Sequence, residues 1–355
     1  MTIAALRSQD GVAGDQHLVV HASVRRQVGD AGDGDRVHLD PVGRTRAVRW
    51  SVGHADTART AAGDDEHQPP ERGQPPGASG RHAARVPSGS VRPREGTTVP
   101  DDLLAPFRAR PERAGVLTDF DGTLSPIVPD PAAARPLPEA AALLHRLADR
   151  YERVAVVSGR PAEFLVRHLG LSGGGRLYAV GLYGMEYAQG GIVTTRPDAE
   201  EWRAVVDTVA REAEEQAPFG VLVERKGLSV TLHYRTAPEE AAWARRFAED
   251  TAGRTGLVVH PARMSDELRP PVPVDKGRVV ADLCEGLEAA CFIGDDVGDL
   301  PAFEALDRIA AARDLHVLKV VAGSAELPAE LATAADVVVD GPAGAVAVLR
   351  ALLPS

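Results

Sequence analysis

The chain has 355 residues, 44% of them hydrophobic, which is enough for about two domains with apolar cores. Its formal net charge of −11 at pH 7 argues against nucleic acid or an anionic membrane as the main partner. No apolar run approaches the ~18 residues of a membrane span, and no secretory signal pattern opens the sequence. We therefore expect a cytoplasmic protein with no nucleic-acid or membrane partner.

Residues 1–97 differ in composition from the rest of the chain. They contain no Phe, Tyr, Lys or Cys, and they hold six of the eleven histidines without metal-ligand spacing. Proline-rich stretches such as residues 68–76 cannot pack a core. We expect a low-complexity, disordered extension. A histidine-rich metal-binding arm, or a segment absent from the working protein, are the alternatives.

Residues 98–197 and 268–355 show the alternation of an α/β core. Helical spacing of apolar residues follows Pro138, an apolar strand covers 153–157, and a helix is expected over 161–169. A strand at 178–180 and a hairpin through Gly190 and Gly191 come next. Strands and helices alternating in this way predict a Rossmann-like parallel sheet covered on both faces.

Residues 198–267 read as an α+β insertion of a different type. A helix over 200–216 precedes a hairpin that pairs 220–226 with 228–235. A second helix near 238–252 and a strand over 257–261 follow. We expect this insertion to act as a cap that closes over a site on the core, excludes water and selects the substrate.

Polar groups stand wherever a predicted core strand ends. Asp119 and Asp121 follow one apolar run, and Ser158 follows the next. Lys276 precedes a helix, and the apolar run 291–294 leads into Asp295, Asp296 and Asp299. The carboxyl ends of parallel strands meet at one edge of a sheet, where ligands bind.

Lysine usage draws attention to Lys276. Only three of the 40 basic residues are lysines, namely Lys226, Lys276 and Lys319, and the other 37 are arginines. A point charge on a flexible stem suits a cluster of phosphate and carboxylates. Lys226 falls in the predicted cap hairpin, whereas Lys319 reads as a solvated strand residue. Cys284 and Cys291 read as buried thiols, not a disulfide framework.

The order of Asp119, Ser158, Lys276 and Asp295 resembles the four motifs of the haloacid dehalogenase-like phosphatases. The resemblance implies that Asp119 is a nucleophile forming an aspartyl phosphate and that Asp121 is the general acid and base. Ser158 and Lys276 would bind the phosphate oxygens.

A metal ion is also implied, because five carboxylates cannot stay unpaired beside a phosphate. They are those of Asp119, Asp121, Asp295, Asp296 and Asp299. Oxygen ligands favour Mg²⁺. By the family pattern the Asp119 carboxylate, the Asp121 carbonyl and Asp295 are ligands, whereas Asp296 and Asp299 orient water or Lys276. Asp299 also reads as the N-cap of the following helix.

Further segments are similar to those of trehalose-6-phosphate phosphatases, and the similarity covers residues 100–355. They include residues 121–127, 181–186, 267–270 and 340–342, together with Glu224, Lys226 and residues 233–235. The resemblance implies hydrolysis of trehalose 6-phosphate to trehalose and phosphate, and functional pairing with a trehalose-phosphate synthase is a further hypothesis. The residues implied in substrate binding are Gly159, Arg160, Tyr183, Glu186, Glu224 and Lys226.

Some positions depart from that family's pattern. Gly298, Leu300 and Pro301 replace a hydroxyl and two acids, Asp266 replaces an apolar residue, and Tyr183 stands where many relatives carry His. Weaker metal binding is one consequence we expect. Two alternatives therefore stay open: another sugar-phosphate phosphatase of the superfamily, and a catalytically silent regulator that binds a sugar phosphate.

Overall fold

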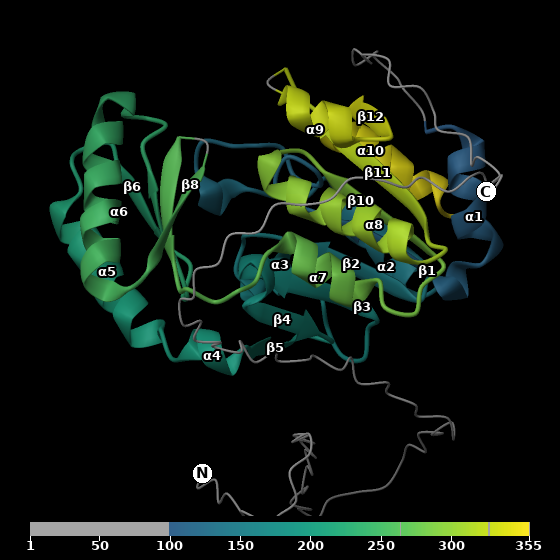
Figure 1. Cartoon of the computed structure of the whole chain (residues 1–355), viewed down its shortest axis with the longest axis horizontal. Helices are drawn as coiled ribbons and strands as arrows, with labels where there is room; N and C mark the ends of the chain where they lie inside the picture. Colours follow the sequence, from purple (N-terminus) through teal and green to yellow (C-terminus); the bar gives the residue numbers. More distant parts are fainter. Residues whose placement is uncertain (1–98, 263, 326, 355) are drawn as a thin grey trace, which may run out of the picture. The chain divides into compact units, whose positions relative to one another are not determined.

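The computed structural model describes residues 99–354 except 263 and 326, and the expected extension over 1–97 lies outside this part. The described residues form a main sheet of eight strands and a second sheet of four (Figure 1). Among their helices, none combines the length and the apolar character needed to cross a membrane.

The main sheet is mostly parallel. Neighbouring strands from β12 to β3 run parallel, and the hairpin of β4 and β5 adds an antiparallel edge. In sheet order the strands are β12 (Val337–Asp340), β11 (His316–Gly323), β10 (Ala289–Gly294), β1 (Ala114–Thr118), β2 (Arg153–Val157), β3 (Leu177–Gly181), β4 (Glu186–Gln189) and β5 (Ile192–Thr195).

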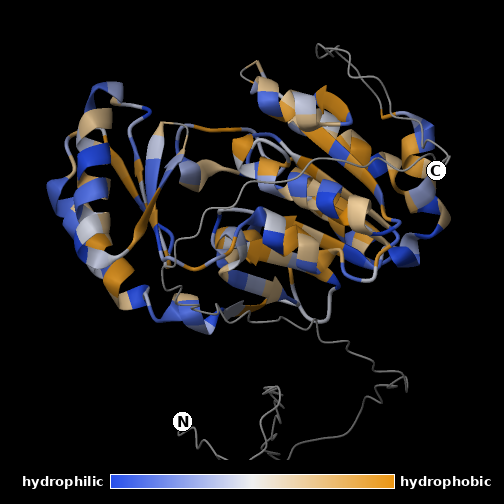
Figure 2. Ribbon diagram, in the orientation of Figure 1, coloured by the Kyte–Doolittle hydropathy of each residue, from blue (hydrophilic) through white to orange (hydrophobic). Residues whose placement is uncertain are grey.

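Helices cover both faces of this sheet, so its central strands are apolar on both sides. Every residue of β1 and β10 is buried. Helices α1, α2, α3 and α10 belong to the cluster on one face, and α7, α8 and α9 pack together on the other. Hydrophobic residues accordingly concentrate in the strands (Figure 2). The helices are α1 (Asp101–Ala109), α2 (Ala140–Ala148), α3 (Ala162–Leu169), α7 (Lys276–Leu283), α8 (Leu300–Ala312), α9 (Ala329–Ala334) and α10 (Gly341–Ala351).

The α/β prediction for the core is confirmed, with differences at element ends. The strand over 153–157 and the hairpin at Gly190 and Gly191 are both present. The helix after Pro138 begins at Ala140 and ends at Ala148. Tyr151 lies beyond the end of that helix, and its hydroxyl donates to the Leu352 carbonyl at 2.8 Å.

The second sheet is antiparallel and lies within the predicted insertion. Helices α5 and α6 pack on one face around a core of its own. In sheet order the strands are β6 (Leu222–Arg225), β7 (Val230–His233), β9 (Ser265–Arg269) and β8 (Val258–Ala262), and the helices are α4 (Pro197–Glu200), α5 (Arg203–Gln216) and α6 (Ala241–Thr255).

Strand β9 is a feature that the sequence analysis missed. It pairs with both β7 and β8, although Ser265-Asp-Glu-Leu-Arg269 has few β-forming side chains. Residues 268 and 269, which we assigned to the core, therefore belong to the second sheet. The division of the chain at 197 and 267 stays a prediction.

Lys319 is not the solvated residue that we expected. It lies in β11 and is buried, and its ammonium donates to both oxygens of Asp307 at 2.7 and 2.9 Å. Cys284 and Cys291 are free and buried, as predicted, and burial raises the pKa of each thiol to about 12.

Asp266 is an acid without a hydrogen-bond partner inside the second sheet. It is fully buried, and neither carboxylate oxygen has a hydrogen-bond partner. Its row across the sheet contains Val223, Leu232 and Pro261, so its side chain shares their apolar face. Arg245, largely exposed, is 3.8 Å away. Burial raises the pKa of Asp266, with Arg245 opposing and Glu249 adding to the rise.

We expect Asp266→Leu to stabilise the protein by about 1–2 kcal/mol at pH 7, because it removes a buried group without a partner. The pKa of this carboxyl is about 4 in the unfolded chain and higher in the folded protein. The folded protein therefore loses stability as pH rises from the unfolded pKa through the folded pKa. The gain should therefore shrink toward pH 4. Thermal melts at both pH values test this, with a rise of roughly 2–6 °C expected at pH 7.

Asp266→Asn and Asp250→Asn form a matched pair for the same measurement. Asp250 is exposed on α6, so its substitution should change stability by less than about 0.5 kcal/mol. Asp266→Asn should stabilise at pH 7 by removing the charge. A fall in melting temperature for Asp266→Leu at pH 7 would contradict the prediction that the buried Asp266 carboxylate destabilises the folded protein.

Candidate active site

Asp119 stands where β1 ends and is nearly buried. Its backbone N–H donates to the Ile293 carbonyl, which fixes the end of β1 against the end of β10. Gly122 follows with φ of +72°, and a Cβ there would lie 1.9 Å from Asp295 Oδ2. Glycine is therefore required for the first acidic turn to approach the acids after β10.

Lys276, the first residue of α7, binds two of the acids. Its ammonium lies 2.9 Å from Asp119 Oδ2 and 2.6 Å from Asp299 Oδ1, and its side chain is only 4% exposed. Burial lowers the pKa of Lys276, but Asp119 and Asp299 outweigh that effect and hold it well above its usual value. The lysine is therefore a fixed cation at the edge of the sheet.

Asp299 both pairs with Lys276 and holds the backbone of the turn after β10. It is fully buried, and its Oδ2 accepts from the backbone N–H groups of Asp295 and Asp296. With Asp296, whose carboxylate accepts from Gly298, it closes the short turn η5 (Val297–Asp299). Asp299 is the N-cap residue of α8, as predicted, but its side chain makes no cap hydrogen bond to that helix.

The acids are arranged for a cation. Oxygens of Asp119, Asp295 and Asp299 lie within 4.8 Å of one another. Burial, together with neighbouring acids, raises the pKa of Asp119 and of Asp295. Asp119 Oδ1 is buried without a hydrogen-bond partner. Lys276 alone cannot neutralise these acids, and one carboxylate oxygen of Asp119 is free. Both features fit a divalent metal ion with oxygen ligands.

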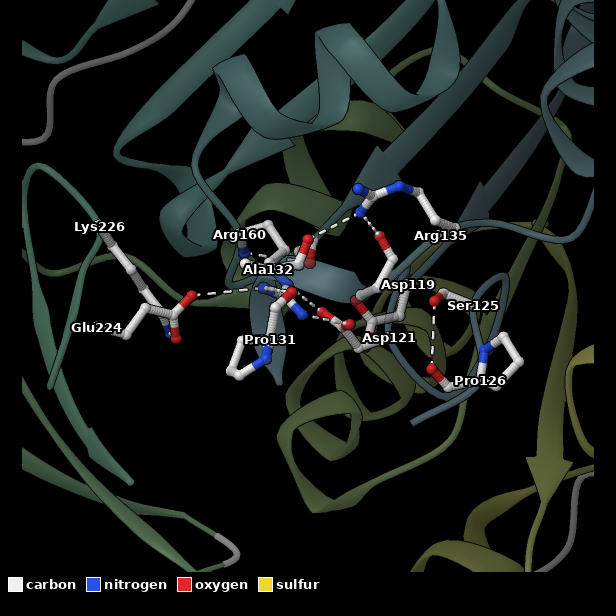
Figure 3. Close-up of polar contacts among 12 residues, drawn as sticks. Asp119, Asp121, Ser125, Pro126, Pro131, Ala132, Arg135, Arg160, Glu224 and Lys226 are labelled. Carbon is white, nitrogen blue, oxygen red and sulfur yellow. Dashed lines mark hydrogen bonds and ion pairs between the residues drawn. The ribbon is translucent and has the colours of Figure 1, made fainter. Parts of the chain in front are cut away.

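Ser158 and Arg160 lie in the loop between β2 and α3, next to these acids. Ser158 is buried, and its hydroxyl oxygen accepts from the Arg160 N–H at 3.2 Å. Arg160 donates to both oxygens of Asp121, from Nε at 2.7 Å and from Nη2 at 2.8 Å (Figure 3). Its Nη1 donates to the Pro131 carbonyl at 2.9 Å and to Glu224 of β6 at 3.4 Å. Arg160 thus joins the loop after β1 to the second sheet.

A strained turn, η3 (Leu182–Gly184), supports that loop. Leu182 and Tyr183 have φ of 48° and 60°, which is unusual for side-chain-bearing residues. Their N–H groups donate to the carbonyls of Arg160 and Ser158, so the strain is balanced by fixed hydrogen bonds. A Cβ on Gly159 would lie 2.3 Å from the Tyr183 hydroxyl, so the tyrosine lies directly against the loop.

Glu186 is placed differently from the other predicted sugar-binding residues. It is buried at the start of β4, and its carboxylate accepts from the Ala162 N–H at 2.8 Å. This contact fixes the start of α3 and hence the Ser158–Arg160 loop. The structure does not bring Glu186 together with Glu224 and Lys226 through any hydrogen bond between described residues.

The second sheet presents a row of polar residues beside these loops. Glu224, Thr231, Glu267 and His260 are paired in turn across its four strands. Glu224 Oε2 lies 2.8 Å from His233 Nε2 and 3.8 Å from Lys226 Nζ. The hairpin carrying Glu224 and Lys226 is present as predicted. Glu224 contacts the core loop through Arg160, whereas Lys226 contacts Glu267 and Glu224 within the second sheet.

Glu267 is a central residue of this row that the sequence analysis quoted in a motif but did not assign. It accepts from Lys226 at 3.3 Å, from Ser229 at 2.6 Å and from Arg269 at 2.6 Å, and the Tyr183 hydroxyl is 3.4 Å away. Burial raises its pKa, but Lys226 and Arg269 outweigh burial and lower it well below its usual range. No sequence pattern could have found it, because Ser265, Asp266 and Glu267 are all polar and do not alternate with apolar residues.

Arg269 and Thr231 were also missed. The Arg269 guanidinium lies over the Tyr183 ring at 3.5 Å, a cation–π contact, and its Nε is buried without a hydrogen-bond partner. Thr231 Oγ1 is likewise buried without one. These groups lie around Glu267, so its surroundings still hold unused hydrogen-bonding capacity.

Comparison with known proteins decides the family. The family model described as Trehalose-phosphatase matches residues 117–334, which include all the acids, Lys276 and the second sheet. The chain belongs to the trehalose-phosphatase family. The described residues have the mostly parallel core and the inserted antiparallel sheet that the sequence predicted.

Curated relatives are named trehalose-phosphate phosphatase. One from Mycobacterium leprae is 29% identical over 84% of this chain and 72% of the relative. One from Mycolicibacterium paratuberculosis is 36% identical over 54% of this chain and 51% of the relative. The chain thus spans about half to three quarters of these relatives.

Solved structures agree on the fold. A trehalose-6-phosphate phosphatase related protein has a TM-score of 0.56 at 25% identity, over 66% of this chain and 95% of that one. The C-terminal domain of the Candida albicans trehalose-6-phosphate phosphatase has a TM-score of 0.57 at 23% identity, over 72% and 96%.

We expect Mg²⁺ to raise the melting temperature, because an ion that binds only the folded acids stabilises by mass action, about 2.7 kcal/mol at 100 times Kd. Raised pKa values at Asp119 and Asp295 mean that protons compete with the ion. The shift should therefore grow as pH rises from 5 to about 8.

Asp295→Asn should abolish most of the Mg²⁺ shift, since it removes a charged ligand. Asp314→Asn, at an exposed position outside the cluster, should leave the shift unchanged. An equal shift in both variants would place the bound ion elsewhere.

Proposed function

We propose that this protein is a Mg²⁺-dependent phosphatase that hydrolyses trehalose 6-phosphate to trehalose and phosphate. The observation that carries the proposal is the buried contact of Lys276 with Asp119 and Asp299. Family membership supports phosphatase chemistry, and the names of the curated relatives support the substrate.

Asp119 is suited to act as the nucleophile. Its Oδ2 is bound by Lys276, whereas Oδ1 is free of hydrogen bonds. Oδ1 attacks phosphorus as the bond from phosphorus to the sugar oxygen breaks, and Asp121 gives its proton to the leaving oxygen. Water then attacks the aspartyl phosphate, Asp121 takes its proton, and cleavage of the bond to Asp119 releases phosphate.

The remaining charged groups hold the phosphate. Lys276 and the Ser158 hydroxyl are positioned to donate to its oxygens, and Asp299 keeps Lys276 in place. Mg²⁺ would be held by Asp119, Asp295 and the Asp121 carbonyl, and when bound it would withdraw charge from the phosphoryl group. The carboxylates of Asp296 and Asp299 accept hydrogen bonds from backbone N–H groups of residues 295–298.

The second sheet supplies groups suited to a sugar. Carboxylates of Glu224 and Glu267 accept from hydroxyls, and Lys226 donates to them. All three are largely buried, so hydroxyls placed to hydrogen-bond them would distinguish one sugar from another. We infer that Tyr183, Gly159 and Arg160 complete this sugar-phosphate site from the core side.

The two alternatives make different use of the same site. Another sugar phosphate would use the same acids with other contacts on the second sheet. A silent regulator is disfavoured, because Asp119, Lys276 and Asp299 keep their contacts despite the altered residues nearby, and Leu300 and Pro301 simply begin α8. Pairing with a trehalose-phosphate synthase stays a prediction.

Phosphate release from trehalose 6-phosphate, sucrose 6-phosphate and glucose 6-phosphate tests the proposal. We expect Mg²⁺-dependent release, strongest with trehalose 6-phosphate, that EDTA abolishes. Asp119→Asn should lower kcat by at least about 10³-fold, since an amide cannot form the covalent intermediate.

The same panel of sugar phosphates distinguishes the proposed function from its two alternatives. Preferential release from another sugar phosphate would keep the mechanism and discard the substrate. A folded protein with Mg²⁺ that releases phosphate from none of them would sink the enzymatic proposal and favour the regulator.

A further inference from the structure

The side chain of Arg160 links Asp121 to the second sheet through hydrogen bonds. Its guanidinium holds three neighbours at once: the Asp121 carboxylate, the Pro131 carbonyl and Glu224 (Figure 3). Phe164 lies under the guanidinium, 4.7 Å from its centre, and limits where the group can move. These contacts come from the loop after β1, from α3 and from β6.

The paired hydrogen bonds from Nε and Nη2 of Arg160 fix the orientation of the Asp121 carboxylate. Two parallel donors on two carboxylate oxygens are the most directional contact that an arginine makes. Asp121 is still 30% exposed on its side chain, so the carboxylate remains accessible beside the guanidinium. Movement of Arg160 would therefore move the acid that faces the leaving oxygen.

Glu224 is the end of this link that responds to a sugar. Its distance to Arg160, 3.4 Å, is the longest of the guanidinium's hydrogen bonds, and Glu224 also lies beside His233 and Lys226. A sugar hydroxyl that binds Glu224 changes the partner of Arg160 Nη1. Because the guanidinium is rigid and planar, the change reaches the two donors on Asp121.

We propose that Arg160 is a positioning residue that determines specificity by coupling sugar binding at Glu224 to the orientation of Asp121. This inference rests on the proposed function and deepens it. Proton transfer is then efficient only for substrates whose sugar occupies Glu224. Small phosphate esters, which cannot reach Glu224, leave Asp121 in its resting orientation and react slowly.

The test compares trehalose 6-phosphate with glycerol 3-phosphate in the full chain with Mg²⁺. Both have an alcohol leaving group, but only the sugar can reach Glu224. We expect Arg160→Lys to lower kcat for trehalose 6-phosphate by about tenfold or more, since misplaced catalytic groups cost up to ~10²-fold. The kcat for glycerol 3-phosphate should fall by a clearly smaller factor, so that the ratio of the two kcat values, which measures the preference for the sugar, falls.

The lysine variant separates this role from phosphate binding. Lysine keeps the positive charge but cannot hold Asp121, Pro131 and Glu224 together. A residue that only bound phosphate would raise KM for both substrates by similar factors. A residue that only supported the fold would lower both kcat values and the melting temperature together. Either pattern would overturn the inference.

A double-mutant cycle provides the second measurement. If the link is real, Glu224→Gln should lower kcat in the Arg160→Lys background by much less than in the wild type. Arg135→Gln is the matched control, because Arg135 donates to the carbonyls of Ala132 and Ala134 in the same loop but touches neither acid. Additive effects of Arg160 and Glu224 on kcat would contradict the coupling.

Failure of the proposed function gives a different result. If the wild type prefers another sugar phosphate, the same variants are compared on that sugar, and the coupling is judged by the same ratio. If Arg160→Lys leaves the preference of an active wild type unchanged, the coupling fails while the proposed function stands.

Discussion

The buried ammonium of Lys276 is the interaction on which the site depends. Three charged groups lie almost out of water, and such burial is tolerable only when every charge is paired and hydrogen-bonded. Asp299 meets that condition on one side through Lys276 and two backbone N–H groups. Asp119 meets it only in part, since one oxygen has no partner. The fold therefore stabilises Asp299 fully and leaves Asp119 one free oxygen, which is where a reactive group is needed.

Much of the site could be predicted because strand ends are easy to read. The apolar runs before Asp119, Ser158 and Asp295 are long enough to indicate buried parallel strands, and the topology then brings their ends together. The pairing of Arg160 with Asp121 could not be predicted, because 39 residues separate them and no pattern encodes a contact across two loops. Lys319 was misread for the same reason, since its partner Asp307 lies on α8.

Strand β9 shows why the insertion was harder to read than the core. Ser265, Asp266 and Glu267 are all polar, and a strand is expected to alternate polar with apolar residues. In the structure all three are buried, because β9 is flanked by β7 and β8 and both of its faces are covered. Tertiary pairing overrode the local pattern. The predicted boundary at 267 fell inside this strand for that reason.

Asp266 and Glu267 demonstrate that position in the sheet, not residue type, decides what a buried acid does. Adjacent residues of a strand point to opposite faces. Glu267 meets Lys226, Ser229 and Arg269, so its charge is stabilised and its pKa falls. Asp266 meets apolar side chains and a distant Arg245, so its charge is penalised and its pKa rises. A one-residue shift of β9 would exchange the two environments, and the pairing register of this strand is therefore itself a requirement of the polar row.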